Sequence, residues 1–583
     1  MAGMAQKERG GGWGRRGLAG SLAAAGLLLV NGLGCGSGST HGGGESKTGP
    51  DGGVGGDVNT PALNVQGGSA SSPGGQGQNG GVVHLVAQGD VVFDSSQAAA
   101  QMPDPPASAM AVDAAALAAD VSITGDAVVN GDVASGGADV VRKIVVSGDL
   151  YVHGKLRSAD LGAARQALDL QAGGTIYVSG TVDTSGAAGA GQAGGNVTLK
   201  AGGGVALAGT VRFGGGAANG SGGGGAGATL TIDADGAVQL GGIIDGRGGA
   251  ATGGAVAGGA AGAVHVGESA APMAIAVVVP VVATGGDGDA SAGVGGTVTP
   301  EPATGTVTIA GAREIDVSGG SSLAAPGAGG LVTGGPRTDP GSGGLHITGE
   351  IIANGGSVRA GGSGNGAEGG RVDFQLVPTD GAVTIDQGAT ITVEGGASGG
   401  AGTAGGGGHV WFFTKDGDAN IGGTISVKGG NAPDPGGVGG LGGMIYFFTD
   451  NNHDAIHNDK GNLHVLTTGL LDASGGMGAT GGAGRSDGIP GLVPSFPDNQ
   501  EQIAIFLNCD GAHGNTLNWM VNDGHLIARG GAHNGAGGDI VYHGIPPGVY
   551  GTGGAGSGDY PVPPGNVDMA GDGTGPSGDF DGE

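Results

Sequence analysis

The sequence has few basic residues, few aromatic residues and two cysteines, and each shortage excludes a class of protein. Lys and Arg number 22 against 51 Asp and Glu, which gives a formal net charge of −29 at pH 7. Nucleic-acid binding depends on clustered cations that displace counterions, so we expect no nucleic-acid partner. Aromatic residues make up 3% of the chain, which excludes a core of large rings. Two cysteines, Cys35 and Cys509, cannot build a disulfide-stapled fold.

Long hydrophobic segments are also scarce. The apolar run Leu18–Val30 has 13 residues and follows four basic residues, the last two of which are Arg15 and Arg16. A membrane-spanning helix needs about 20 apolar residues, whereas the hydrophobic region of a secretory signal peptide needs fewer. We therefore predict a signal peptide over residues 1–34. The Arg pair leaves a twin-arginine signal open as an alternative.

The end of this segment, Gly32-Leu33-Gly34-Cys35, resembles the lipobox of bacterial lipoproteins. The departure from that motif is Gly32, where the family usually has Leu. The resemblance implies that Cys35 is lipidated and becomes the mature N-terminus. It also implies an outer-membrane lipoprotein held by an acyl anchor on the surface or the periplasmic face, with ordinary secretion as the alternative.

What the sequence has in abundance is glycine: 148 of 583 residues, with 25 prolines. Residues 35–81 are rich in Gly and Ser, and we interpret them as a flexible tether. Residues 551–583 carry acidic side chains but neither Lys nor Arg, which predicts a disordered acidic tail. Between them, residues 82–550 contain a repeat marked by glycine pairs.

These pairs recur at positions 186, 214, 248, 285, 319, 355, 395, 429, 475 and 530. Self-similarity with such a period is typical of stacked repeat architectures. Each clear repeat holds three short segments with alternating apolar residues, as in 409–413, 419–421 and 424–428. We predict an all-β fold, a right-handed parallel β-helix, with Val, Ile and Ala inside.

Long excursions of Gly, Ala, Ser and Asn separate these repeats, for example 214–227 and 395–408. They are either mobile or stacked as extended polyglycine-type chains that hydrogen bond between coils. In addition, the Ala-rich segments 107–119 and 158–170 suggest helical pieces that cap or flank the solenoid.

The glycine excursions resemble the glycine-rich domains of PGRS-type surface proteins. Together with the signal peptide, the lipobox and the tether, they resemble glycine-rich parallel β-helix surface lipoproteins of myxobacterial-type Gram-negative bacteria. The resemblance covers nearly the whole chain and concerns architecture rather than activity.

Candidate chemistry is sparse. Counting three residues back from the glycine pairs aligns Asp183, Asp245, Asp316 and Asp472 with Thr392 and Ser426 on the outer surface, with carboxylates never in adjacent coils. A carboxylate ladder facing a polysaccharide is one interpretation, and a polar outer face is the other. The His453–His457 pair and a loose group around Cys509 lack the pattern of a zinc site. We expect no cofactor and no defined metal site, only weak Ca²⁺ binding by a polyanion.

We favour a non-enzymatic scaffold or adhesin that contacts glycan or extracellular matrix through a repetitive acidic, glycine-rich face. The alternative is a polysaccharide lyase or glycoside hydrolase on the same fold, with Asp245 and Asp316 as candidate catalytic residues. An ice- or mineral-binding surface built from the glycine excursions is a third interpretation.

Overall fold

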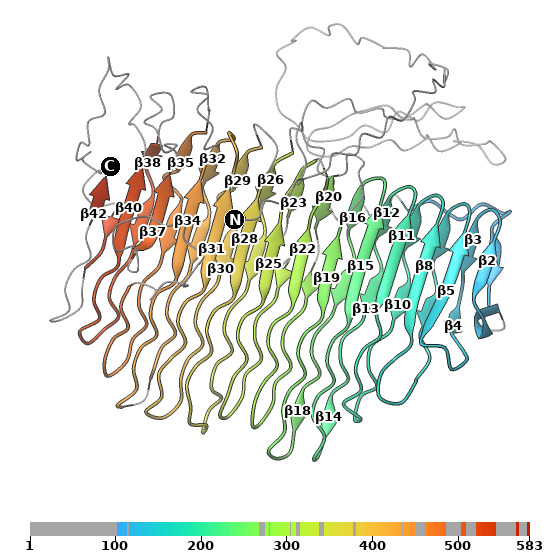
Figure 1. Ribbon diagram of the computed structural model, residues 1–583, viewed down its shortest axis with the longest axis horizontal. Helices are drawn as coiled ribbons and strands as arrows, with labels where there is room; N and C mark the ends of the chain where they lie inside the picture. The colour runs from blue at the N-terminus through green and yellow to red at the C-terminus, as the bar shows by residue number, and fades with distance from the viewer. Residues whose placement is uncertain are drawn as a thin grey trace, which may run out of the picture. The chain divides into compact units, whose positions relative to one another are not determined.

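The computed structural model describes residues 102–113, 116–267, 274–278, 280–303, 305–310, 315–336, 343–376, 381–433, 435–449, 461–484, 503–508, 520–543, 567–570 and 580–582. The predicted signal peptide, Cys35 and the tether lie outside these residues. In the described part, three long parallel sheets form a right-handed parallel β-helix (Figure 1). Each coil passes through sheet 1, sheet 2 and sheet 3 in turn, and from residue 184 onward a glycine-rich excursion leads from one coil to the next. The predicted fold class is confirmed.

Sheet 1 has 14 strands: β2 (Val121–Ile123), β5 (Val141–Val146), β8 (Ala167–Ala172), β11 (Val197–Ala201), β15 (Thr229–Ala234), β19 (Ala263–Val266), β22 (Thr297–Pro300), β25 (Leu331–Gly334), β28 (Arg371–Gln375), β31 (His409–Phe413), β34 (Met444–Phe448), β37 (Ile503–Asn508), β40 (Asp539–His543) and β42 (Phe580–Gly582).

Sheet 2 has 13 strands: β1 (Met110–Val112), β3 (Ala127–Val129), β6 (Leu150–Val152), β9 (Ile176–Val178), β12 (Val205–Leu207), β16 (Val238–Leu240), β20 (Ile275–Val277), β23 (Val307–Ile309), β26 (Leu345–Ile347), β29 (Val383–Ile385), β32 (Ala419–Ile421), β35 (Leu463–Val465) and β38 (Met520–Asn522).

Sheet 3 has 13 strands: β4 (Asp132–Ala134), β7 (Lys155–Arg157), β10 (Thr181–Asp183), β13 (Thr210–Arg212), β17 (Ile243–Asp245), β21 (Val281–Val282), β24 (Ile315–Asp316), β27 (Glu350–Ile352), β30 (Thr390–Thr392), β33 (Thr424–Ser426), β36 (Leu470–Asp472), β39 (His525–Ile527) and β41 (Val567–Asp568). A two-stranded sheet of β14 (Ala218–Asn219) and β18 (Ala251–Thr252) joins two excursions.

The strands form where apolar and polar residues alternate, because successive side chains of a strand point to opposite faces of the sheet. In β8 the even-numbered residues Leu168, Leu170 and Ala172 are buried, and the residues between them are half-buried. Parallel pairing in register stacks like on like, so Leu170 lies beside Leu199 in the next coil. The inward side chains of all three sheets form one continuous core, chiefly of Val, Ile, Leu and Ala. Phe374, Phe412 and Phe447 also lie in it, so the low aromatic content does not exclude large rings from this part of the core.

The two predicted helical pieces are wrong. The described residues of 107–119 form β1 and a three-residue 3-10 helix, η2 (Ala116–Ala118), whose Leu117 is fully buried. Residues 158–170 contain no helix and run into β8, because the alternation from Ala167 onward matches a strand that pairs on both edges. No helix in the described ranges is long and apolar enough to cross a membrane.

The predicted disordered tail needs a partial correction. Within 551–583, β41 adds to sheet 3 beside β39, and β42 adds to sheet 1 beside β40. An open sheet edge offers unpaired backbone groups, so even two or three residues can extend it. Arg529 and Asp568 form an ion pair at the first of these junctions.

The glycine excursions are ordered in the described part of the chain, which confirms the stacked alternative. Each excursion has an outgoing and a returning limb. The amide of Gly259 on a returning limb donates to the carbonyl of Gly249 on the outgoing limb, and Gly286 of the next coil donates to Gly259, at 2.8 and 2.9 Å. One column of such bonds runs through successive coils, from Gln192 to Gly535.

The column contains Gln192, Gly216, Gly225, Gly249, Gly259, Gly286, Gly293, Gly320, Gly327, Gly356, Ala367, Gly396, Gly405, Gly430, Gly440, Gly476, Gly482, Gly531 and Gly535. Each residue after the first donates its N–H to the carbonyl oxygen of the one before it, at 2.7 to 3.1 Å. The peptide groups therefore align along the stack, an arrangement in which hydrogen bonds polarise one another.

Candidate functional site

Three features of the solenoid surface could carry a function: a row of charged residues on sheet 3, a group of aromatic residues on sheet 1 and a hollow near the N-terminal coils. The predicted carboxylate ladder corresponds to the first. Strand register places one residue per coil in this row, in the order Ala134, Arg157, Asp183, Arg212, Asp245, Val282, Asp316, Ile352, Thr392, Ser426, Asp472, Ile527 and Asp568.

The outward orientation of this row is as predicted, because its neighbours Ile315 and Val317 are fully buried while Asp316 is half-buried. Carboxylates never occupy adjacent coils of the row. Since coils stack about 4.8 Å apart, alternate coils hold them roughly 10 Å apart. The alignment by glycine pairs did not place Arg212 in this row, although it lies between Asp183 and Asp245. The excursion registers pair Ala218 with Ala251, so the glycine pair of that coil begins at 215 rather than 214.

Asp245 and Asp316, the two candidate catalytic residues, are bound to their own turns. Asp245 accepts two hydrogen bonds from Arg247, at 2.9 and 2.8 Å, and this carboxylate raises the pKa of Arg247 by hydrogen bonding and by its charge. Asp316 accepts a bond from the backbone N–H of Ser318 at 3.0 Å. Val282 separates the two in the row.

The same local turn recurs along the row. Asp183 and Asp472 each accept bonds from the backbone N–H and the hydroxyl two residues later, Ser185 and Ser474. Burial acts to raise the pKa of Asp183, but the bonds from Ser185 and the cation of Lys155 lower it overall. Aspartate therefore closes the turn that leads from sheet 3 into the excursion, which is a structural role.

One cation in this region lies between two carboxylates. The Lys428 ammonium is 3.4 Å from Asp472 and 3.9 Å from Glu394, which belong to the coils on either side of it. Ser426 also donates to Glu394. Lys428 and Glu394 are accessible and Asp472 is mostly buried, and the single cation leaves one of the two negative charges uncompensated.

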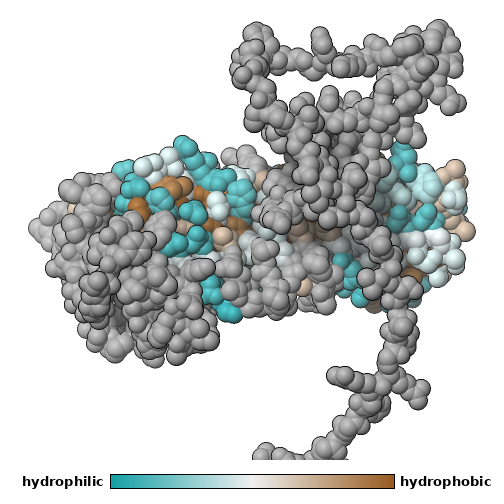
Figure 2. All heavy atoms as spheres, turned by 90° about the horizontal axis from the view of Figure 1, so that it is seen from above, coloured by the Kyte–Doolittle hydropathy of each residue, from teal (hydrophilic) through white to brown (hydrophobic). Residues whose placement is uncertain are grey.

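The second feature is a set of outward-facing aromatic residues, which we call the aromatic platform: Trp411, Phe413, Tyr446, Phe448 and Phe506 on β31, β34 and β37. Ring centroids lie 4.6 Å apart for Trp411 and Phe413 and 5.8 Å apart for Trp411 and Tyr446. Tyr446, Phe448 and Phe506 are buried, whereas Trp411 and Phe413 keep part of their rings accessible. The solenoid seen from above shows an apolar area bordered by hydrophilic residues toward its C-terminal half (Figure 2).

Polar groups border the platform on the preceding strand β28 and at the start of β31. Arg371 of β28 lies over the Trp411 ring, with its guanidinium carbon 5.5 Å from the centroid, and forms an ion pair with Asp373. His409 follows in register with Arg371, and burial together with that cation lowers the pKa of His409 to about 4. Burial also raises the pKa of Tyr446. Sequence reasoning missed this platform, although the strings His-Val-Trp-Phe-Phe and Met-Ile-Tyr-Phe-Phe carry it.

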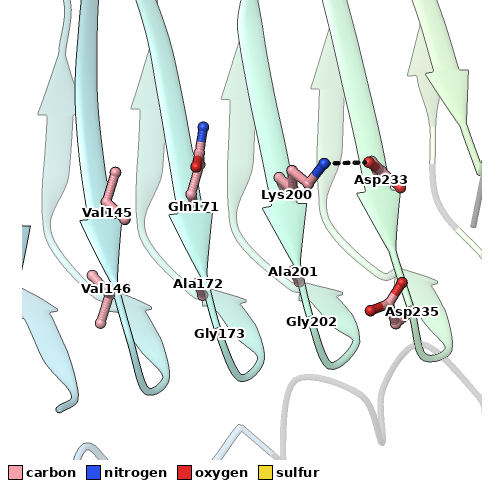
Figure 3. A pocket seen from close by; sticks show the side chains of 10 residues that line it. All are labelled: Val145, Val146, Gln171, Ala172, Gly173, Lys200, Ala201, Gly202, Asp233 and Asp235. Carbon is pink, nitrogen blue, oxygen red and sulfur yellow. Dashed lines mark ion pairs between the residues drawn. The ribbon is translucent and has the colours of Figure 1, made fainter. Parts of the chain in front are cut away.

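The third feature is a hollow of about 500 Å³ over β5, β8, β11 and β15 (Figure 3). Lys200 and Asp233 form an ion pair at 3.3 Å on one side of it, and Gln171 and Asp235 line it as well. Figure 3 shows Lys200 and Asp233 directed toward each other rather than toward a common point in the hollow. Because Lys200 and Asp233 are paired with each other, these two side chains do not converge on a ligand in the hollow.

The described residues contain no group of three or more His, Cys, Asp or Glu that could hold a metal ion. Asp289, at the end of the stretch Gly285-Gly286-Asp287-Gly288-Asp289, accepts bonds from the amides of Gly253 and Gly254 and from Arg359. These bonds lower its pKa. His453, His457 and Cys509 lie outside the described residues.

Comparison with models of protein families, with curated proteins and with solved structures found no match to this chain.

Proposed function

We propose that the chain is a non-enzymatic scaffold or adhesin of the bacterial surface, anchored through a lipid on Cys35, that contacts glycan or matrix along its solenoid. The observation that carries this proposal is the backbone hydrogen-bond column from Gln192 to Gly535. It extends order from the core into the glycine excursions, so the coils can present a repetitive surface over many repeats. Repetition lets weak contacts act together.

The charges of the sheet 3 row are consistent with this role. Asp183, Asp245 and Asp472 each have a Lys or Arg within 3.4 Å, and Asp316 closes a turn. A general acid needs a raised pKa, and a base must point at its substrate. The aspartates of the sheet 3 row are bound to neighbouring cations and turn amides, so we assign them a structural role rather than a catalytic one.

A carbohydrate-active enzyme is the second candidate. The observation that favours it is the position of Lys428 between the carboxylates of Glu394 and Asp472. Two carboxylates on either side of a cation resemble the components of glycan-cleaving sites, in which paired carboxylates act on one bond. Asp245 and Asp316 belong to the same alternative. The test below separates it from the scaffold.

The full chain is incubated with a panel of insoluble and soluble polysaccharides, with and without Ca²⁺. Retention on the insoluble glycan is measured, together with new reducing or unsaturated ends. The scaffold predicts retention without product. Product formation that Lys428→Ala abolishes would replace the scaffold with the enzyme, and the absence of both retention and product would refute both functions.

A further inference from the structure

We infer that the aromatic platform is the glycan-contact site of this protein and that its ligand is a neutral polymer of hexose rings. This inference rests on the proposed function and names its place and its chemistry. In a chain with 3% aromatic residues, five outward-facing rings gather on three consecutive strands of one sheet. The parallel register that stacks them places Thr333 and Asp373 in the same row of the two preceding strands.

The inward face of these strands carries its own aromatic stack, so the main core does not require the outward rings, three of which are buried in a separate hydrophobic cluster with Met444 and Ile503. Phe374, Phe412 and Phe447 point inward and stack on one another, with centroids 5.9 and 4.8 Å apart. They fill the interior without help from the platform. Elsewhere in sheet 1 the corresponding outward positions hold Thr198 and Thr231, which are half-buried. The platform is therefore a local departure from a polar surface.

Two polar atoms within the platform are buried and lack a partner, and a ligand with hydroxyl groups that entered between the rings would satisfy them. The Tyr446 side chain is 6% exposed, and its Oη has no hydrogen-bond partner, nor has Nε1 of Trp411. A buried polar atom without a partner costs free energy, and such atoms in native proteins call for an explanation. A sugar offers an apolar C–H face to an aromatic ring and hydroxyl groups to its polar edge. Aromatic rings with polar tips suit that combination.

The charges around the platform favour a neutral ligand over an anionic one. Arg371 lies over the Trp411 ring, and Asp373 already neutralises it. His409 is uncharged at neutral pH because its pKa is about 4. The chain as a whole carries a formal charge of −29, which repels polyanions at long range. Among the described residues around the platform, Arg371 is paired with Asp373, so it is not a free cation for a uronic-acid polymer.

The test uses the full chain and compares Trp411→Ala with Tyr177→Ala. Tyr177 is a half-buried, outward-facing aromatic residue on sheet 2 that stacks on Tyr151, so it matches Trp411 in kind but lies on another sheet. Binding to cellohexaose, and to polygalacturonate as the anionic control, is measured by calorimetry. We expect Trp411→Ala to weaken cellohexaose binding at least tenfold and Tyr177→Ala to leave it unchanged, because central aromatic contacts dominate binding energy.

A second variant keeps the test independent of folding. Tyr446→Phe preserves the ring and its packing but removes the unpartnered hydroxyl. We expect thermal stability to be unchanged or higher and cellohexaose affinity to fall about threefold to tenfold, the range for one lost hydrogen bond. A purely structural platform would show the stability change without the affinity change, and that result would overturn the inference.

The outcomes separate the two proposals. If the unaltered chain binds none of the polysaccharides, the proposed function itself fails. If it binds cellohexaose and Trp411→Ala binds equally well, the function stands and the platform is not its site. Preference for polygalacturonate would refute the neutral ligand. Loss of self-association in sedimentation by Trp411→Ala, without loss of glycan binding, would identify a second copy of this chain as the occupant.

Discussion

The carbonyl oxygen of Ala367 occupies the space that a side chain on Gly405 would need. A Cβ atom built on Gly405 would lie 1.8 Å from that oxygen. Gly405 belongs to the hydrogen-bond column and donates to Gly396 at 2.8 Å. Glycine is thus required here by the close approach of neighbouring coils.

This relationship yields a matched pair of variants in adjacent positions. A Cβ on Gly406 would have one neighbour within 4 Å, the Leu441 carbonyl at 3.8 Å. We expect Gly405→Ala to destabilise the fold by about 2 kcal/mol or more, since overpacking costs about 1–3 kcal/mol even where side chains can move. Gly406→Ala should change stability by less than about 0.5 kcal/mol. Chemical denaturation followed by circular dichroism measures both, and equal effects would argue against a close-packed excursion layer.

Arg142 should be the most sensitive charged residue of the N-terminal coils. Its side chain is 1% exposed and bonds to Asp120 at 3.1 Å, Asp139 at 2.9 Å and the Gly136 carbonyl at 2.8 Å. Asp120 and Asp139 are largely exposed, so water replaces Arg142 at both carboxylates in Arg142→Ala. We expect a loss of about 1–3 kcal/mol, from the buried packing of the Arg142 side chain and its bond to the Gly136 carbonyl.

The control for that prediction is Arg212→Ala, on the exposed row of sheet 3. Surface substitutions of this kind change stability by about 0.5 kcal/mol or less. The difference between the two midpoints in urea is the measurement. An Arg142→Ala variant as stable as Arg212→Ala would show that the first coils do not depend on this anchor.

His409 predicts that the protein loses stability on mild acidification. The pKa of His409 is about 4 in the folded protein, against 6.5 for the ordinary side chain. Between these values the unfolded chain binds more protons than the folded one, so stability is fully present above pH 6.5 and falls as the pH drops toward 4. The loss is at most about 3 kcal/mol.

In His409→Gln this part of the pH dependence should disappear. Unfolding midpoints measured from pH 7 to pH 4.5 test it, with the unaltered chain as reference. Parallel pH profiles for the two proteins would contradict the prediction. Carboxylates with lowered pKa values, such as Asp183 and Asp568, lose their stabilising contribution below pH 3.8, outside this window.

Lipidation at Cys35 is a prediction of the sequence alone. Cys35→Ala should abolish incorporation of labelled palmitate and move the chain from the membrane fraction to the soluble fraction. Cys509→Ala is the matched control, since Cys509 is the other cysteine of the chain, and it should behave like the unaltered protein. Label retained in Cys35→Ala would show that the acyl anchor is elsewhere.

Much of the fold could be predicted from residue patterns. Alternation in segments such as Arg371–Gln375 predicts a strand with one buried face, and repetition of the glycine pairs predicts coils. The outward position of Asp316 follows from its buried neighbours. The helix predicted over residues 158–170 was wrong because this Ala-rich segment is compatible with both helical and strand periodicity. Pairing with the neighbouring strands β5 and β11 makes its C-terminal part a strand.

Other features could not be read from the sequence. Whether the glycine excursions are ordered depends on backbone hydrogen bonds between coils. Glycine has no side chain, so these bonds produce no pattern of residue types in the sequence. The row position of Arg212 was hidden by a one-residue shift of its glycine pair. The aromatic platform needs the register of β31 against β34, which joins residues 35 positions apart, such as Trp411 and Tyr446. The two tail strands are too short for any pattern.

The most direct measurement is amide hydrogen exchange across the glycine excursions. The proposed scaffold requires them to be ordered, so the column amides of Gly259, Gly293 and Gly405 should exchange as slowly as those of the neighbouring strands. Gly220, at the tip of an excursion with a φ of 80°, should exchange faster, because its bond to the Thr252 carbonyl is long, at 3.3 Å. Slow exchange along the whole column is the predicted result. Exchange of the column amides at the rate of an unstructured chain would contradict an ordered excursion layer and remove the observation on which the proposed function rests.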